Sequence, residues 1–301
     1  MSQTVRPSVF RDLFLAEREA ERGVKPNTLR SYRRAIDQFL GTPGAPEDIA
    51  GLAKSHLIAW TVAMRRRHVS EGAINSYQRP VWSWLRWLFA EGYIADDLAH
   101  RARMVYPTER KRRTASDQAR RDLITVARAR AENRYRNVAL IETLWSTGIR
   151  RTELAGVTLE DVDLEHGAIV VRHSKTGRTR INGIGAQARL SLQQYIVHER
   201  GDKPGGLFLQ RGKRSMTSNA MLLVLRSLSA SAGVTVSSHD FRRACAARLL
   251  ESGMAVDDVA RQLGHSTLTM TLVYGEEGRT KRALDAYHEV DRGIIPMRRR
   301  A

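Results

Sequence analysis

Apolar residues in the first hundred positions recur every three or four residues, which predicts amphipathic helices. The segments with this pattern are residues 8–23, 25–41, 54–68 and 71–92. Gly23 and Gly41 stand where the first two helices are expected to end, because glycine commonly ends a helix. We expect Asn27 or Thr28 to cap the second helix, and Pro80 to kink or begin the fourth.

Three tryptophans in the fourth segment, Trp82, Trp84 and Trp87, allow two interpretations. They could form a platform on which nucleic-acid bases stack, or they could pack between helices. Their helical spacing favours packing in a core.

The composition changes at residues 100–116, where a proline and many charges replace the apolar pattern. Such a stretch is typical of a linker between domains. We therefore expect a helical domain at residues 1–105, a basic linker at 106–116 and a second domain at 117–301. The linker could lie along DNA or simply be solvated.

The second half predicts more helices and the chain's one convincing β pattern. Helices are expected at residues 116–132 and 135–148, the latter ending at Gly148. Short β-branched runs at 168–173 and 179–185 flank a glycine-containing turn at 174–178. Helices resume at 186–199 and continue to the end. The pattern predicts a mostly helical domain with a small antiparallel sheet.

The charge indicates a polyanionic partner. Fifty Lys and Arg against 32 Asp and Glu give a formal net charge of +18, for which nucleic acid is the leading partner. No apolar run approaches the roughly 20 residues of a membrane span, and the N-terminus lacks a signal-peptide core. The single Cys245 excludes an internal disulfide framework and a cysteine-rich zinc site, and it fits a reducing cytoplasm. The basic end, residues 297–301, is either a phosphate-binding arm or a solvated terminus.

Two residues near turns are candidates for anion and proton chemistry. Arg150 follows Gly148 and precedes a new helix, where it could face an anion or simply pair with Glu153 on the surface. Lys175 lies in the expected hairpin turn, where it could reach into a cleft and donate a proton or remain solvated.

His239 and Arg242 lie three residues apart at an expected helix start, so they share one face of that helix. Phe241, Cys245 and Leu249 are expected to form its buried stripe, which leaves the His239–Arg242 face free to contact something else. A plain basic surface helix is an equal alternative on these residues alone. The neighbouring Arg243 competes with Arg242 for the arginine position.

Near the end of the chain, a helix that buries residues such as Val259 and Leu263 is expected to stop at Gly264. His265 follows at the junction, and Tyr274 comes nine residues after it in a second short helix. Either residue alone would be read as a packing residue.

Taken together, these stretches resemble the tyrosine recombinase family, also called the phage integrase family. The resemblance rests on "TGIRRTELAGV" (147–157), "HDFRRACAARLL" (239–250) and "LGHSTLTMTLVY" (263–274), in that order and spacing, and covers about residues 115 to 290. The N-terminal helices resemble the family's core-binding domain only loosely. The expected fold is thus mainly α: a helical core-binding domain plus an α-rich catalytic domain with a small antiparallel sheet.

The resemblance implies a role for each residue. Arg150 and Arg242 would hold the non-bridging oxygens of a DNA phosphate, with His265 adding a third hydrogen bond. Tyr274 would attack phosphorus, His239 would take its proton, and Lys175 would protonate the leaving 5′-oxygen. The hairpin reads "HSKTGRT" where the family commonly has glycine–lysine–glycine, so Arg178 and Arg180 are alternatives to Lys175. Where arginine is doubled, the register favours Arg150 over Arg151 and Arg242 over Arg243.

The resemblance also implies a function. We expect a site-specific recombinase that forms a 3′-phosphotyrosyl intermediate, acting as a homotetramer on double-stranded DNA with specific core sites, in the cytoplasm of a bacterial host. It would need no cofactor, metal, small-molecule substrate or membrane. Because about a hundred residues precede the linker, a phage or mobile-element integrase of a simple type without an arm-binding domain is expected. Arg30, Arg34 and Arg79 are candidate DNA contacts. The alternatives are a chromosome-dimer-resolving recombinase, a relaxing type IB topoisomerase and a DNA-binding regulator without catalysis.

Overall fold

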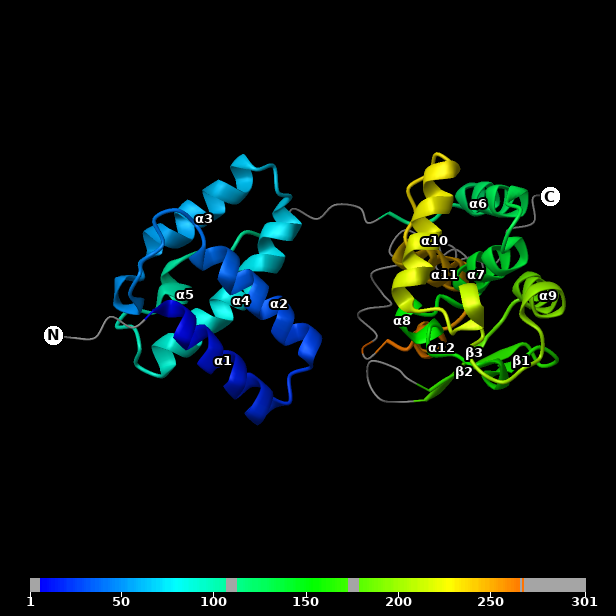
Figure 1. Ribbon diagram of the computed structural model, residues 1–301, viewed down its shortest axis with the longest axis horizontal. Helices are drawn as coiled ribbons and strands as arrows, with labels where there is room; N and C mark the ends of the chain where they lie inside the picture. The colour runs from blue at the N-terminus through cyan, green and yellow to red at the C-terminus, as the bar shows by residue number, and fades with distance from the viewer. Residues whose placement is uncertain (1–5, 107–112, 173–178, 266, 268–301) are drawn as a thin grey trace, which may run out of the picture. The chain divides into compact units, whose positions relative to one another are not determined.

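A computed structural model of the chain describes residues 6–106, 113–172, 179–265 and 267. The chain divides into two compact units, Met1–Lys111 and Arg112–Ala301 (Figure 1). Each has its own hydrophobic core.

The first unit is helical, as its periodicity predicts. Its elements are α1 (Pro7–Arg22), α2 (Pro26–Leu40), the short 3-10 turn η1 (Ile49–Gly51), α3 (Lys54–Arg66), α4 (Glu71–Ala90) and α5 (Leu98–Arg101). Helices α1, α2 and α4 pack against one another.

One expectation about helix starts in this unit is wrong, and one of the two alternatives for Pro80 is excluded. The cap of α2 is Lys25 rather than Asn27 or Thr28, because Pro26 takes the first helical position. Proline suits that position, since its fixed backbone angle is already helical and the position needs no N–H donor. Pro80 does not begin α4, which starts nine residues earlier at Glu71 and continues through the proline.

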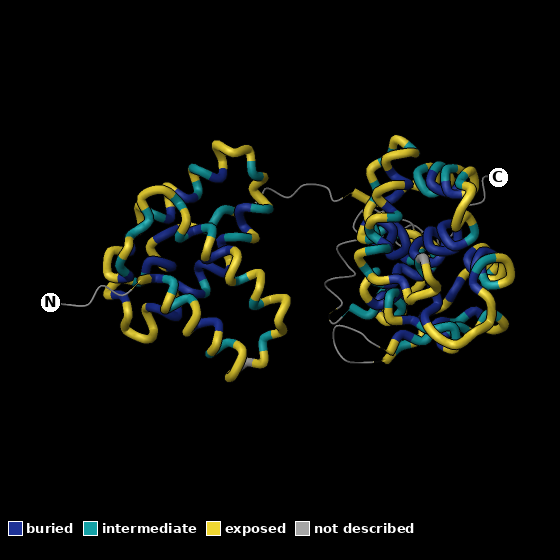
Figure 2. Tube along the Cα trace, in the orientation of Figure 1, coloured by how far each residue is buried: buried dark blue, intermediate teal, exposed yellow. Residues whose placement is uncertain are grey.

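The tryptophans of α4 are core residues. Trp84 is 0% exposed and Trp82 only 2%, and the ring of Trp84 meets Phe39 of α2 edge to face. Figure 2 shows the buried segments of this unit running along the facing sides of its helices. Rings enclosed in this way cannot stack on bases, so the packing interpretation is confirmed.

The second unit is built around a helix that is buried on most sides. Its helices are α6 (Asp117–Ala129), α7 (Arg134–Thr147), α8 (Arg151–Leu154), α9 (Ala186–Tyr195), α10 (Ser218–Ser231), α11 (Ser238–Glu251) and α12 (Val256–Leu263). Short helical turns η2 (Leu159–Asp161), η3 (Ile196–Arg200) and η4 (Arg211–Lys213) join them. Helix α7 packs against α6, α9 and α11, and nearly all of its residues are buried (Figures 1 and 2).

A three-stranded antiparallel sheet completes the second unit. Its strands are β1 (Val162–Asp163), β2 (Ala168–Val171) and β3 (Arg180–Gly183), in the order β1-β2-β3. Val171 pairs with Arg180, and Ala168 with Gly183. The two predicted strands are present, and β1 is an addition that the sequence pattern did not indicate, because two residues are too few to show an alternation.

Within the described parts of the chain, none of the helices combines the length and the apolar character that crossing a membrane requires.

Candidate functional site

The site is centred on the turn that leads from α7 into α8. Gly148 ends α7 with a left-handed backbone (φ +59°), and its N–H bonds to the carbonyl of Leu144. A side chain at this position would meet Leu263 of α12 at 2.5 Å and Cys245 of α11 at 3.1 Å. Glycine therefore allows three helices to approach one point, and the predicted helix stop has a packing reason as well.

Arg150 leaves this turn and is held by two elements. Its Nη1 donates to Oε1 of Glu153 at 2.8 Å, and its backbone N–H donates to Oε2 of the same carboxylate at 3.0 Å. Its Nη2 donates to the carbonyl of Gly264 at 3.0 Å. The pair with Glu153 was expected on the surface as the plain alternative, and that placement is wrong, because the Glu153 side chain is only 2% exposed.

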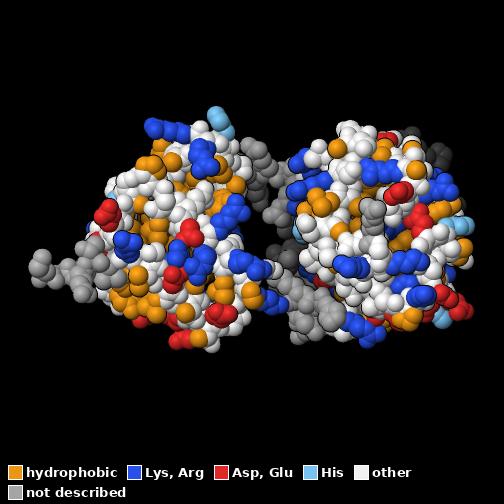
Figure 3. Space-filling model, in the orientation of Figure 1, with side chains coloured by type: hydrophobic (Ala, Val, Ile, Leu, Met, Phe, Trp, Pro, Cys, Tyr) orange, Lys and Arg blue, Asp and Glu red, His pale blue; other side chains and the backbone are white. Residues whose placement is uncertain are grey.

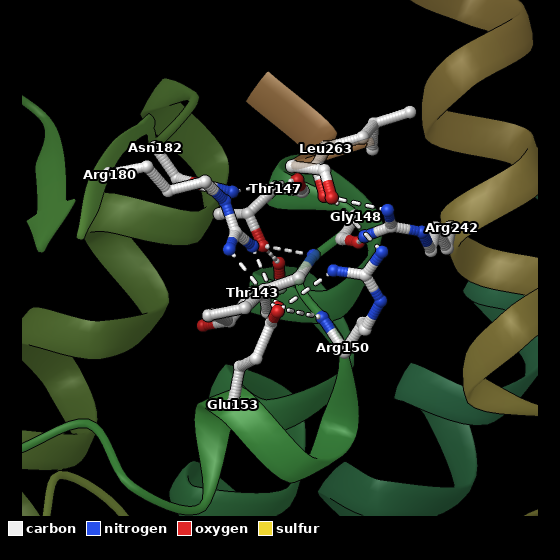
Figure 4. A network of polar contacts seen from close by, with 11 residues as sticks. Thr143, Thr147, Gly148, Arg150, Glu153, Arg180, Asn182, Arg242 and Leu263 are labelled. Carbon is white, nitrogen blue, oxygen red and sulfur yellow. Dashed lines mark hydrogen bonds and ion pairs between the residues drawn. The ribbon is translucent and has the colours of Figure 1, made fainter. Parts of the chain in front are cut away.

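Arg242 is buried, with 4% of its surface exposed. Its Nη1 donates to the carbonyl of Gly148 at 2.8 Å and its Nη2 to the carbonyl of Leu263 at 2.6 Å (Figure 4). The alternative of a plain basic surface helix is therefore wrong for Arg242. The carbonyls at the ends of α7 and α12 accept its hydrogen bonds, which makes burial of a guanidinium tolerable.

The second arginine of each doublet points elsewhere. Arg243 donates to the carbonyl of Arg113 and to Asp240. Arg151 donates to the carbonyl of Ser218 at the start of α10. The geometry thus brings Arg150 and Arg242 together.

His265 stands directly after the end of α12. Gly264 has a left-handed backbone (φ +65°), and the N–H of His265 bonds to the carbonyl of Ala260. Burial, followed by the charges of Arg242, Arg150 and Arg180, lowers the pKa of His265 to about 4. Its imidazole is therefore neutral at neutral pH and can donate one hydrogen bond.

His239 lies on the first turn of α11 and is exposed. Partial burial and the nearby charges of Arg242, Arg243 and Arg150 lower its pKa. A neutral imidazole at this position can accept a proton.

The sequence did not indicate the part that Arg180 takes in the network around Glu153. Arg180 was named only as an alternative to Lys175, yet its guanidinium donates to both oxygens of Glu153, at 3.2 and 2.7 Å. Its Nε donates to Asn182, whose amide donates to the carbonyl of Thr147 (Figure 4). Burial alone would raise the pKa of Glu153, but the hydrogen bonds and charges of Arg180 and Arg150 lower it overall.

The charges around the turn favour an anion. Arg150 and Arg180 share the carboxylate of Glu153, and Arg242 bonds to the carbonyl of Gly148 in the same turn. Guanidinium groups are suited to bidentate phosphate recognition. Within the described ranges, no group of three or more His, Cys, Asp or Glu residues is arranged to hold a metal ion. Lys175, Arg178 and Tyr274 lie outside the described residues.

The three candidate DNA contacts all lie in the first unit. Arg30 and Arg34 are exposed on α2, and Arg79 is exposed on α4. Arg30 bonds to Asn27, and Arg79 bonds to Asn75. Figure 3 shows lysine and arginine side chains distributed over the visible surface of both units.

Known proteins resemble this chain over most of its length. Residues 112–279 match the model of the phage integrase family. The tyrosine recombinase XerD of Mycobacterium tuberculosis (strain ATCC 25618 / H37Rv) is 30% identical, over 93% of this chain and 94% of that protein.

Two solved structures share the fold. A lambda integrase tetramer bound to a Holliday junction has a TM-score of 0.74 at 18% identity, covering 91% of this chain and 78% of that one. The Tn1549 transposon integrase in complex with circular intermediate DNA has a TM-score of 0.71 at 20% identity, covering 88% and 94%. From its sequence and its fold, the chain belongs to the phage integrase family and is a tyrosine recombinase.

Proposed function

We propose that this recombinase cuts and rejoins double-stranded DNA at specific sites, with Arg150, Arg242 and His265 holding the reacting phosphate. The observation that carries the proposal is the convergence of these three residues. Carbonyls of Gly148 and Leu263 hold Arg242, the carbonyl of Gly264 holds Arg150, and His265 follows Gly264 directly.

The two arginines suit the charge that develops during the reaction. Attack on a phosphodiester adds negative charge to the non-bridging oxygens, and donors fixed in advance stabilise that charge most effectively. Arg242 is fixed by burial, while Arg150, with 22% of its side chain exposed, is the one that reaches the surface. Neutral His265 supplies a further donor without adding a charge.

The remaining steps use Tyr274, His239 and Lys175. The Tyr274 hydroxyl gives its proton to His239 while its oxygen bonds to phosphorus, and the bond from phosphorus to the 5′-oxygen breaks. Lys175 gives a proton to that oxygen, which leaves as a 5′-hydroxyl. A second 5′-hydroxyl then attacks the phosphotyrosyl bond and releases the tyrosine, so strand exchange needs no external energy source.

The proposal is tested by trapping the covalent intermediate on a nicked suicide substrate that contains the selected DNA site. Wild-type protein should form a protein–DNA adduct, and Tyr274→Phe should form none. Tyr106→Phe is the matched control. Tyr106 is a 75% exposed tyrosine that is not among the proposed catalytic residues, so its replacement should leave the adduct intact. Absence of an adduct with wild-type protein, or its persistence in Tyr274→Phe, would overturn the assignment.

Within this function, we propose the role of a phage or mobile-element integrase acting as a tetramer, as the lambda integrase structure does on a Holliday junction. The alternative role, chromosome-dimer resolution, is kept because the XerD relative aligns along nearly the whole chain. An integrase joins two different sites, whereas a resolving enzyme joins two copies of one site. A recombination assay with both substrate pairs therefore separates the two roles.

The first unit supports this function as the DNA-binding domain. Arg30, Arg34 and Arg79 are proposed to contact phosphates, since most protein–DNA hydrogen bonds go to the backbone. Replacing any one of them by glutamine should weaken binding equally for all sequences and reduce the salt dependence by about one counterion. An unchanged salt dependence would remove that arginine from the interface.

A further inference from the structure

Arg180 is fixed in place more tightly than a surface arginine would be. Only 12% of its side chain is exposed, and three nitrogen atoms of its guanidinium have partners. Its Nε donates at 2.9 Å to Asn182, a fully buried residue that is itself anchored to the carbonyl of Thr147. The direction of the guanidinium is therefore set by α7 through Asn182.

Glu153 is shared unequally between two arginines. Arg180 engages both carboxylate oxygens with two nitrogens, which is the stronger, bidentate geometry. The Arg150 side chain engages one oxygen with Nη1, and its Nη2 goes to the carbonyl of Gly264. A carboxylate already paired on both oxygens competes less strongly for the rest of the Arg150 guanidinium.

We propose that Arg180 is a positioning residue for the recombination reaction: by taking the bidentate pairing with Glu153, it keeps the Arg150 guanidinium turned toward the substrate phosphate. This inference rests on the proposed function of Arg150. Arg180 acts through Glu153 and touches no reacting atom. Figure 4 shows the two arginines approaching Glu153 from different elements, β3 and the α7–α8 turn.

The same guanidinium also lies against the turn that carries His265. A Cβ atom on Gly264 would be 2.8 Å from the guanidinium carbon of Arg180, so the backbone of Gly264 packs closely against the guanidinium. The charges that act on His265 come from three elements: Arg242 on α11, Arg150 at the start of α8 and Arg180 on β3. Glu153 pairs with two of these, Arg150 and Arg180. Loss of Arg180 removes one positive charge from this set.

The test compares Arg180→Met with a matched control, Arg172→Met. Arg172 follows β2 and pairs at 2.6 Å with the buried carboxylate of Asp161. Like Arg180, it is therefore an arginine near the sheet that pairs with a buried carboxylate. Single-turnover cleavage of the suicide substrate and DNA affinity are measured separately. Arg180→Met should slow cleavage by about 100-fold, the size expected for a misplaced reacting group, with DNA affinity little changed. Arg180→Lys should recover part of the rate, since it keeps the charge but not the fork.

Two further measurements separate positioning from general damage. If Arg180 acts through Glu153, the double variant Arg180→Met/Glu153→Gln should lose much less cleavage rate than the product of the two single-variant losses. The pKa of His265, followed by NMR in the full-length protein, should rise in Arg180→Met and stay unchanged in Arg172→Met.

Equal cleavage by Arg180→Met and Arg172→Met, or fully independent effects in the double variant, would overturn the inference. So would an unchanged His265 pKa in Arg180→Met. If the methionine variant does not fold, Arg180→Lys should still cleave more slowly than wild-type protein because it loses the bidentate pairing with Glu153, and cleavage at the wild-type rate would overturn the inference. Failure of wild-type protein to form any adduct would instead overturn the proposed function, and the NMR titration would still decide where Arg180 lies.

Discussion

Replacing Gly148 by alanine is the smallest change that should disrupt the site. The residue has a φ of +59°, and an added Cβ would lie 2.5 Å from Leu263 and 3.1 Å from Cys245. Leu263 and Cys245 are both fully buried, so neither can move aside into solvent. The Gly148 carbonyl also accepts a hydrogen bond from Arg242, so a shift of this turn moves the arginine as well.

The expected cost has two parts. A left-handed backbone costs a residue with a Cβ about 1–2 kcal/mol, and forcing an extra carbon into a packed core costs about 1–3 kcal/mol. Gly148→Ala should therefore lower the free energy of unfolding of the second unit by about 2–5 kcal/mol, a large part of the roughly 5–15 kcal/mol typical of a domain. Gly233→Ala isolates the first part, because Gly233 has a φ of +64° and no atom within 4 Å of the added carbon.

The assay is urea unfolding of the full-length protein. Unfolding is monitored by hydrogen exchange at amides of α7 and α11, so that the second unit is observed by itself. Cleavage of the suicide substrate is measured at a temperature at which all three proteins are folded. We expect Gly148→Ala to be less stable than Gly233→Ala by at least about 1 kcal/mol and to cleave more slowly. Equal stability of the two variants would refute the close packing of α7, α11 and α12 around this glycine.

Three other predictions concern single residues of the second unit. The thiol of Cys245, whose pKa burial raises to about 11, should react with a disulfide reagent at pH 8 only as fast as the protein unfolds, and rapid labelling would contradict its burial. Because the folded pKa of His265, about 4, lies below the unfolded value near 6.5, the unfolded state binds the extra proton between these pH values. His265 therefore contributes stability that falls as the pH drops through this window, and His265→Asn should show a shallower acid dependence in urea titrations, whereas an equal or steeper one would argue against the low pKa. Arg200→Met should lower the melting temperature and reduce the free energy of unfolding by at least about 2 kcal/mol, because the buried guanidinium donates to backbone carbonyls in residues 201–207. An unchanged melting temperature would contradict this.

The periodicity of the chain was sufficient for most of the architecture. Apolar spacing located the helices of both units, and glycine marked the ends of α7 and α12. Errors came at helix starts, as with Lys25 in place of Asn27 or Thr28, because a proline at the first helical position outweighed the usual capping preference. Helix positions and helix ends depend on residues that are close together in the chain, so rules based on local sequence are able to predict them.

The site was predictable as a set of residues but not as a network. Order and spacing singled out Arg150, Arg242 and His265, and the structure brings them to one turn. Whether Tyr274 and Lys175 complete that set remains a prediction for the adduct experiment, since they lie outside the described residues.

The sequence by itself determined the helical pattern, the excess of positive charge and the order of the residues that identify the family. Only the tertiary structure decided that Arg242 is buried, that Glu153 lies in the interior and that Arg180 shares its carboxylate. The physical reason is separation along the chain. Arg180 and Gly264 are distant in sequence from Glu153 and Arg150, and a burial pattern cannot show which carbonyls or carboxylates will meet a charged side chain once the helices have packed.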